Sequence, residues 1–333
     1  MKLKIAHILF LFSSLLYSQN LFPILGGQRA GTSVFTFLKI GVSAKAEGMA
    51  EAVVAHHQNA SSIFYNPATV AQFSQTQISV SRIQWPADIQ YDYFSVATSI
   101  NQRHHIGVSA GVLHIKPMLE TTEYNPHGTG KYFVFQDRFI GLTYGSKMTD
   151  RFSFGVTLKS VTEDLAGHNM STFLLDMGTF YWTGFRSLRF SASLLHFGPQ
   201  TKPEGTFIKR ILDMDTGEEV EIETEFELFS PPTVFRVGVA MDILELSEQN
   251  LTVSVQLNHP VDNSENISLG MEYSLLRSLF LRGGYKLNKD EVDYSFGFGV
   301  RKKIGLIIIE ADYAYTHFQH LSPPSRFSLG LSF

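Results

Sequence analysis

Short runs of alternating apolar and polar residues fill most of this chain from residue 76 onward. In the run 151–159, apolar side chains alternate with small or polar ones, and the runs 235–243, 251–258 and 292–301 repeat the pattern. An alternation of this length predicts a β-strand with one apolar and one polar face. Such strands are typical of a wall that has lipid on one side and water on the other.

The number of these runs predicts a closed wall. Marking each run gives about fourteen strands, at the ~9–11 residues that one membrane crossing needs. The 28 Phe, 13 Tyr and 26 Gly accompany a mean hydropathy near zero, as expected when lipid-facing and water-facing sides average out. We therefore expect an all-β fold, a transmembrane antiparallel β-barrel over residues 75–333. The predicted strands begin near Thr76, Tyr91, His104, Phe133, Arg151, Ser171, Leu188, Thr233, Asn250, Glu265, Leu279, Val292, Ile304 and Ser325.

The connections between the predicted strands sort by length. Those after even-numbered strands are short, whereas the long connections 116–132, 199–232 and 316–324 follow odd-numbered strands. Outer-membrane barrels have short periplasmic turns and longer outer loops. A soluble β-sandwich has no reason to sort its loops in this way, so the pattern favours a membrane barrel.

The longest of these loops, 199–232, is acidic in its second half. Val220, Ile222, Thr224 and Phe226 alternate there with glutamates, which suggests a hairpin above the membrane. It is the best candidate in the chain for a surface that contacts a partner. A solvated hairpin without a partner explains the pattern equally well.

Both ends of the sequence carry features of an exported membrane protein. Lys2 and Lys4 precede an apolar run over 5–16, which is the order of a secretory signal, and we expect residues 1–18 to be a signal peptide. The last predicted strand resembles the signal by which the barrel-insertion machinery recognises outer-membrane proteins. We expect a Gram-negative outer-membrane location, in contact with outer-membrane lipid. The residues of the predicted insertion signal are Phe327, Leu329, Leu331 and Phe333.

The block 35–73 differs from everything after it. It is rich in alanine and has no sustained period of two. Since the first strand begins in the periplasm, an apolar, glycine-broken segment ahead of it belongs in the lumen or at its periplasmic mouth. We expect residues 19–74 to form a plug that contains short helices. Asn66 is placed to cap a helix whose first turn begins at Pro67.

Three parts of this block, 37–42, 44–49 and 63–68, resemble the N-terminal signature of the PorV/PorQ family. That family belongs to a larger group of barrels that includes the FadL-type transporters, and the resemblance implies a fourteen-stranded wall with an N-terminal plug. The sequence departs from the family pattern at Ala50 and Glu51, where two glycines are commoner, and at 56–59, where acidic residues are commoner. The motif residues are Gly41, Gly48, Met49, Tyr65, Asn66, Pro67 and Ala68.

The resemblance implies two different functions. PorV-like proteins serve the type IX secretion system, where they carry or anchor exported proteins. FadL-like proteins conduct hydrophobic small molecules as the plug moves. We expect a non-enzymatic accessory role in protein export or surface attachment, with secretion-system components or exported proteins as partners. Transport of hydrophobic small molecules across the outer membrane is the alternative.

The polar faces of the predicted strands carry charges of both signs. Selective pores tend to collect one sign, whereas a lumen closed to water pairs its charges. We expect these residues to pair with one another and with the plug, and a selective aqueous pore is the alternative. The predicted network is Arg236, Asp242, Glu272, Arg282, Asp293, Arg301 and Glu310, with Lys159, Lys286 and Asp312 also facing inward.

Other chemistry has little support in the sequence. Adjacent histidines, as at 56–57 and 104–105, rarely bind one metal ion, so we expect solvated side chains there and no metal site. The chain has no cysteine and no G-x-S-x-G turn, and we expect no catalytic residue and no cofactor. A net charge of −4 without a basic stripe gives no reason to expect nucleic acid.

Overall fold

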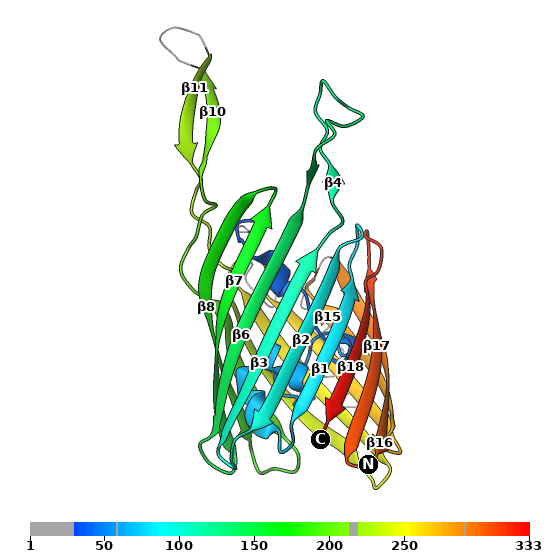
Figure 1. Ribbon diagram of the computed structural model, residues 1–333. Helices are drawn as coiled ribbons and strands as arrows, with labels where there is room; N and C mark the ends of the chain where they lie inside the picture. Colours follow the sequence, from blue (N-terminus) through cyan, green and yellow to red (C-terminus); the bar gives the residue numbers. More distant parts are fainter. Residues whose placement is uncertain (1–29, 58, 213–218, 290) are drawn as a thin grey trace.

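Fourteen antiparallel strands close into a barrel in the computed structural model, which describes residues 30–57, 59–212, 219–289 and 291–333. Strand β1 pairs with β18, which closes the wall. Figure 1 shows this wall around the short blue helices of the N-terminal segment. The prediction of an all-β barrel with an N-terminal plug is confirmed. The predicted signal peptide, residues 1–18, lies outside the described residues.

The strands of the wall follow the predicted runs closely, and most begin within one or two residues of the expected position. The largest differences are at β8 and β17, each of which begins three residues away. The wall strands are β1 (Gln77–Gln84), β2 (Gln90–Ser99), β3 (His104–His114), β6 (Phe135–Lys147), β7 (Phe152–Leu165), β8 (His168–Trp182), β9 (Arg189–Phe197), β12 (Val234–Glu245), β13 (Gln249–Pro260), β14 (Asn266–Leu275), β15 (Leu279–Leu287), β16 (Val292–Ile304), β17 (Ile307–Phe318) and β18 (Ser325–Ser332).

The two ends of the barrel differ in their connections. At the end where β1 begins and β18 ends, short turns such as 246–248 join the strands. At the opposite end two hairpins rise above the wall, β4 (Met118–Leu119) with β5 (Tyr132–Phe133) and β10 (Thr206–Leu212) with β11 (Glu219–Glu225) (Figure 1). Since outer-membrane barrels have short periplasmic turns, we call these the periplasmic and the outer end.

The outside of the wall is apolar. Leu142, Phe296 and Leu329 are about half exposed or more on three different strands, and their neighbours in sequence point inward and are small or polar. A surface of this kind is stable when it faces lipid. No helix among the described residues is long and apolar enough to cross a membrane.

Residues 34–73, which we call the plug, run through the lumen from the outer end to the start of β1. Most of its described side chains are buried. Its elements are short because the chain changes direction repeatedly to fill the space between the strands. They are η2 (Thr36–Lys39), α2 (Ala44–Gly48), η3 (Ala60–Phe64) and η4 (Pro67–Gln72).

Glycines on the inner faces of the strands allow the plug backbone to touch the wall. A Cβ added to Gly155 of β7 would lie 2.5 Å from the Ala68 nitrogen, and one added to Gly270 of β14 would lie 2.7 Å from the Met49 carbonyl oxygen. Real Cβ atoms do not approach other atoms so closely. The wall and the plug are therefore fitted to each other at the backbone level.

Aromatic packing joins the plug to the half of the wall that contains β2 and β6. Phe64 of the plug lies 5.8 Å from the ring of Tyr93 and 6.0 Å from that of Phe139, and Phe37 lies 6.0 Å from Tyr91. All five rings are buried. On this side the inner face of the wall carries several aromatic rings, which the plug covers.

Candidate functional site: the plug and its two cavities

Two sizeable cavities flank the plug, one toward each end of the barrel. The outer cavity has a volume of about 480 Å³ and contacts the first part of the plug. The periplasmic cavity has a volume of about 570 Å³ and reaches the turns at Leu246 and Arg277. Both volumes are within the usual range for small-molecule sites.

The outer cavity is mainly apolar. Phe37 and Ile40 of the plug form one side, and residues at the outer ends of the strands form the rest. Charged residues also line it, and several of these are already paired. The apolar wall residues are Trp85, Ile89, Leu113, Phe135, Val292, Phe318 and Leu321.

The periplasmic cavity is polar in contrast. Lys45, His56 and His57 of the plug line it, together with charged residues from the strands β12 to β16. Arg189 donates two hydrogen bonds to Asp242, at 3.1 Å each. This half of the lumen is where the sequence places most of its predicted charges.

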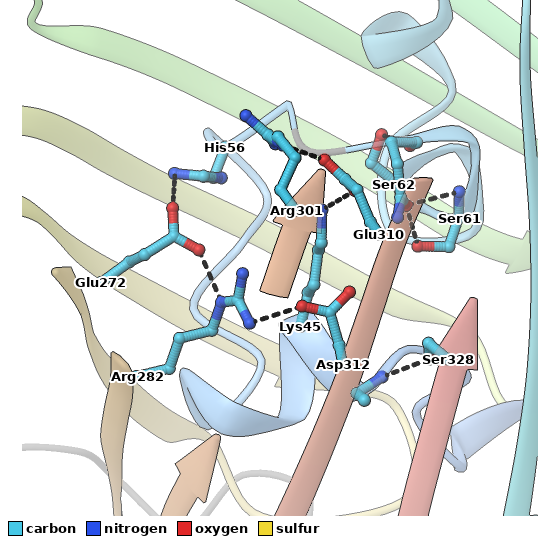
Figure 2. Close-up of polar contacts among 12 residues, drawn as sticks. Lys45, His56, Ser61, Ser62, Glu272, Arg282, Arg301, Glu310, Asp312 and Ser328 are labelled. Carbon is cyan, nitrogen blue, oxygen red and sulfur yellow. Dashed lines mark hydrogen bonds and ion pairs between the residues drawn. The ribbon is translucent and has the colours of Figure 1, made fainter. Parts of the chain in front are cut away.

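Ion pairs connect the plug to the charged half of the wall, as Figure 2 shows. Glu310 of β17 is paired with Lys45 of helix α2 and with Arg301 of β16. The side chains of Lys45 and Glu310 are 3% and 8% exposed, so water screens this pair weakly. One carboxylate therefore holds both a plug residue and a wall residue.

A second group surrounds Arg282 on β15. Its guanidinium donates to Glu272 at 2.5 Å and to Asp312 at 2.8 Å (Figure 2). Glu272 is also 3.9 Å from the imidazole of His56 in the plug. Arg282, Glu272 and Asp312 lie on three different strands, so the group braces the wall under the plug.

The structure brings most of the predicted network together as pairs. Arg282 and Glu272 form one pair and Arg301 and Glu310 another, while Asp242 pairs with Arg189. Arg236 lies over the ring of Tyr65, 5.7 Å from its centre.

Asp293 lies apart from this network. A register shift between Val292 and Ser295 changes the alternation at the outer end of β16, so that Val292 is buried and Asp293 is not. Asp293 instead accepts hydrogen bonds from Gln319, at 3.0 and 3.1 Å. Its predicted position on the lumen face was wrong because a strict period of two does not anticipate a bulge.

The motif at 65–68 joins the plug to the strands β8 and β9. Asn66 accepts a hydrogen bond from the Ala68 nitrogen at 3.0 Å, and Pro67 opens η4, so the predicted cap is present. Asn66 also donates to the carbonyl oxygens of Val54 and Thr179. The Tyr65 carbonyl oxygen accepts from Ser193 at 3.1 Å.

The other motif residues surround helix α2. Gly48 lies against Gly297 of β16, and Met49 is buried beside Gly270. The carbonyl oxygen of Gly41 accepts from Arg326 at 3.4 Å. Gly41, Gly48 and Met49 thus mark where α2 meets the wall.

Ala50 and Glu51 both have a left-handed backbone, with φ of 50° and 60°. This conformation is strained for residues other than glycine. The pair is where the PorV/PorQ pattern more often has two glycines. The wall leaves room for this turn at Gly284, where a Cβ would collide with the Ala50 backbone.

Glu51 is held by cations from two strands. Its carboxylate accepts from Lys286 at 2.7 Å. Burial raises the pKa of Glu51, but Lys286 and Arg236 lower it further, to about 2. The plug therefore carries a fixed negative charge at this point.

The plug histidines are only partly exposed and line the periplasmic cavity, so the expectation of solvated side chains at 56–57 is met only in part. The ring of His57 packs edge-on against Phe180 and Trp182, at 5.8 Å from each. Burial lowers the pKa of His56 to about 4 and the pKa of His57 to about 3. Of the second pair, His104 is partly exposed and stacks on Tyr144, while His105 is buried.

Sequence reasoning missed a buried cluster in which Lys159 lies 2.5 Å from Asp176. Asp176 also accepts from the backbone nitrogen of His196 at 2.7 Å. The cluster sits where the register between β8 and β9 shifts, and it lies against Phe64 of the plug. An aspartate within an otherwise apolar and small-residue run, as at Asp176, was the available signal.

Three residues of the predicted insertion signal, Phe327, Leu329 and Leu331, lie on the outer face of β18, and Phe333 follows the strand directly. They are between 39% and 59% exposed in the isolated chain. Among the described residues, no group of three or more His, Asp or Glu side chains is arranged to hold a metal ion.

No protein-family model matches the sequence, and no curated protein matches it. The PorV/PorQ resemblance therefore remains a prediction. Several solved structures are similar to the fold. The CymD monoaromatic hydrocarbon channel has a TM-score of 0.56 and 14% identity, and the match covers 88% of this chain and 96% of that one.

Two further solved structures give the same result, each over 88% of this chain. The Pseudomonas aeruginosa FadL homologue has a TM-score of 0.55 and 12% identity, with 98% of its chain covered. The Pseudomonas putida toluene transporter TodX also has a TM-score of 0.55 and 12% identity, with 97% covered. At these identities the likeness shows a shared fold: this chain has the FadL-like barrel.

Proposed function

We propose that this protein is an outer-membrane channel for hydrophobic small molecules, with the plug as its gate. The observation that carries the proposal is the apolar outer cavity of about 480 Å³, which rests on Phe37 and Ile40 of the plug. An apolar molecule that enters this cavity from the outer end is stabilised there, because transfer out of water lowers its free energy.

The similar solved structures support this choice. They are a monoaromatic hydrocarbon channel and a toluene transporter, and they share the barrel over 88% of this chain. The FadL-like fold and the apolar outside of the wall also support an outer-membrane location.

The plug separates the outer cavity from the periplasmic one. Leu38, Met49 and Val53 are among the plug side chains that are at most 2% exposed, so passage requires the plug to move. The ion pairs of Lys45 and Glu51 with the wall hold it in the closed position. Opening therefore involves separating buried charges, which makes the closed state the resting state.

Uptake into liposomes tests the proposal. Purified protein in liposomes with a lipopolysaccharide outer leaflet, which slows the entry of apolar molecules, should take up toluene faster than the same liposomes without protein, and deletion of residues 34–73 should raise the rate further. If neither protein exceeds empty liposomes, the channel function is wrong.

An accessory role in protein export is the second candidate, and the β10–β11 hairpin favours it. The hairpin stands above the outer end (Figure 1). Its side chains Phe207, Ile208 and Ile222 are exposed. A cell that lacks the gene should then lose secreted or surface proteins. An unchanged set of secreted proteins would eliminate this role.

A further inference from the structure

The outer cavity contains a buried carboxyl group that its apolar lining does not explain. Asp137, near the outer end of β6, lines the cavity and is 2% exposed. Its Oδ1 has no hydrogen-bond partner among the described residues. An unsatisfied buried acceptor is costly, and native proteins rarely keep one without a use.

The neighbours of Asp137 make its position less favourable still. Glu163 of β7 is directly opposite it across the strand pair. Glu163 is occupied by the plug, because it accepts from the Phe35 nitrogen at 2.8 Å. The hydroxyl of Tyr91 on β2 is also buried, and it has no hydrogen bond to Asp137 or to any other described residue. No described cation forms an ion pair with Asp137.

Most cations of the cavity are held elsewhere. Lys39 is paired with Asp262, Lys286 with Glu51, and Arg326 donates to Thr316. Lys289 is on the exposed rim. The unmet requirement inside the cavity is therefore for a hydrogen-bond donor, and a positive charge would satisfy it best.

The aromatic lining suits the same kind of ligand. Phe37, Trp85, Phe135 and Phe318 line the cavity with Asp137. Aromatic faces attract ammonium groups, and they also pack against hydrocarbon. A cavity of aromatic rings with one unpaired carboxyl group can prefer ligands that carry an ammonium group, whereas a purely apolar cavity cannot.

We propose that the outer cavity selects apolar molecules that carry a donor head group, an amine above all, and that Asp137 receives this head. The inference rests on the proposed channel function and narrows its substrate class. A charge-assisted hydrogen bond in a buried site raises the affinity about tenfold or more.

Fluorescence of Trp85 offers a direct test. The sequence has two tryptophans, so Trp182→Phe leaves Trp85 as the sole reporter in the cavity. The probes share one skeleton: butylbenzene, 4-phenylbutan-1-ol, 4-phenylbutylamine and 4-phenylbutanoate. The amine should bind at least tenfold more tightly than butylbenzene, and the carboxylate should bind most weakly.

Variants of Asp137 separate the head-group effect from the apolar one. Asp137→Asn should no longer bind the amine more tightly than butylbenzene. It should still bind the alcohol more tightly than butylbenzene, because the amide retains an acceptor. Asp137→Leu should lose both preferences and still bind butylbenzene. Asp92→Asn, on the outer face of β2, is the matched control and should behave as the parent.

The outcomes distinguish the two proposals. Equal affinity for the amine and butylbenzene, or an amine preference that survives in Asp137→Leu, overturns the role of Asp137 and leaves the channel standing. Absence of quenching by every probe in a protein that still shows the heat-dependent gel shift of a folded barrel overturns both.

Discussion

Gly48 of the plug and Gly297 of β16 meet backbone to backbone. A Cβ added to Gly48 would lie 2.9 Å from the Gly297 Cα, and one added to Gly297 would lie 3.0 Å from the Gly48 Cα. No side chain fits between them. The closed state therefore depends on a close contact of the main chain as well as on ion pairs.

The first prediction concerns adjacent glycines on β15. Gly284→Ala should destabilise the closed state by roughly 1–3 kcal/mol, because the new methyl group collides with the Met49–Ala50 backbone. Gly283→Ala is the matched control, since its Cβ would meet only Met271, at 3.8 Å. The measurement is the near-UV circular dichroism of the buried aromatics during heating. Equal midpoints for the two variants would contradict the fit described here.

The second prediction compares the two partners of one ion pair. Glu310→Gln should destabilise the closed state by roughly 3–5 kcal/mol, because it leaves both Lys45 and Arg301 without their anion. Lys45→Met should cost about 1 kcal/mol, because Glu310 keeps Arg301. Chymotrypsin cleavage at the buried aromatic residues of the plug, which neither variant changes, measures the difference. A Lys45→Met protein that is cleaved as fast as Glu310→Gln would show that Glu310 does not link plug and wall.

The third prediction is a loss of plug stability in mild acid. When the plug leaves the lumen, the imidazoles of His56 and His57 bind protons as the pH falls through about 6.5. In the closed plug their pKa values are about 4 and 3, so they stay neutral over this range. Protonation thus favours the released plug between pH 6.5 and 4, by roughly 1–3 kcal/mol per histidine. The contribution of Glu51 is lost only at lower pH, because its pKa is about 2.

Unfolding midpoints at pH 7.5 and pH 5 test this prediction. The parent protein should lose several degrees at the lower pH, and the double variant His56→Gln, His57→Gln should lose much less. An equal loss in both proteins would assign the effect to other groups.

The wall was predictable from the sequence because its two faces meet different solvents. Lipid outside and polar or plug-covered space inside impose a period of two, and the short periplasmic turns follow from the antiparallel path. Fourteen strands and their approximate starts follow from this one pattern. The bulge that moves Asp293 did not, since it depends on how β16 pairs with β17.

The plug was harder to predict because its contacts are long-range. The sequence identifies Gly48 and Asn66 as unusual, but it does not show that they face Gly297 and Gly178 of the wall. The burial of His57 follows from its packing on Trp182, which is more than 100 residues away in the sequence. Asp137 gave no signal of its own, because its lack of a partner is visible only when the cavity is known.

A reversible lock on the plug tests the central claim most directly. A Cβ at Gly238 of β12 would lie 2.6 Å from Cγ1 of Val54, so Val54→Cys and Gly238→Cys place a thiol of the plug against a thiol of the wall. The same Cβ would lie 2.8 Å from the Val255 carbonyl oxygen, so each variant is compared with itself before and after reduction. The sequence has no other cysteine, so this pair would be the only thiols present. Each single variant is a control for the oxidant.

Toluene uptake by liposomes that have a lipopolysaccharide outer leaflet and contain the double variant is the measurement. The account predicts uptake near that of empty liposomes when the cross-link is formed and full uptake after reduction, with both single variants unaffected. Equal uptake in the cross-linked and reduced states would contradict the claim that the plug gates a channel for hydrophobic small molecules.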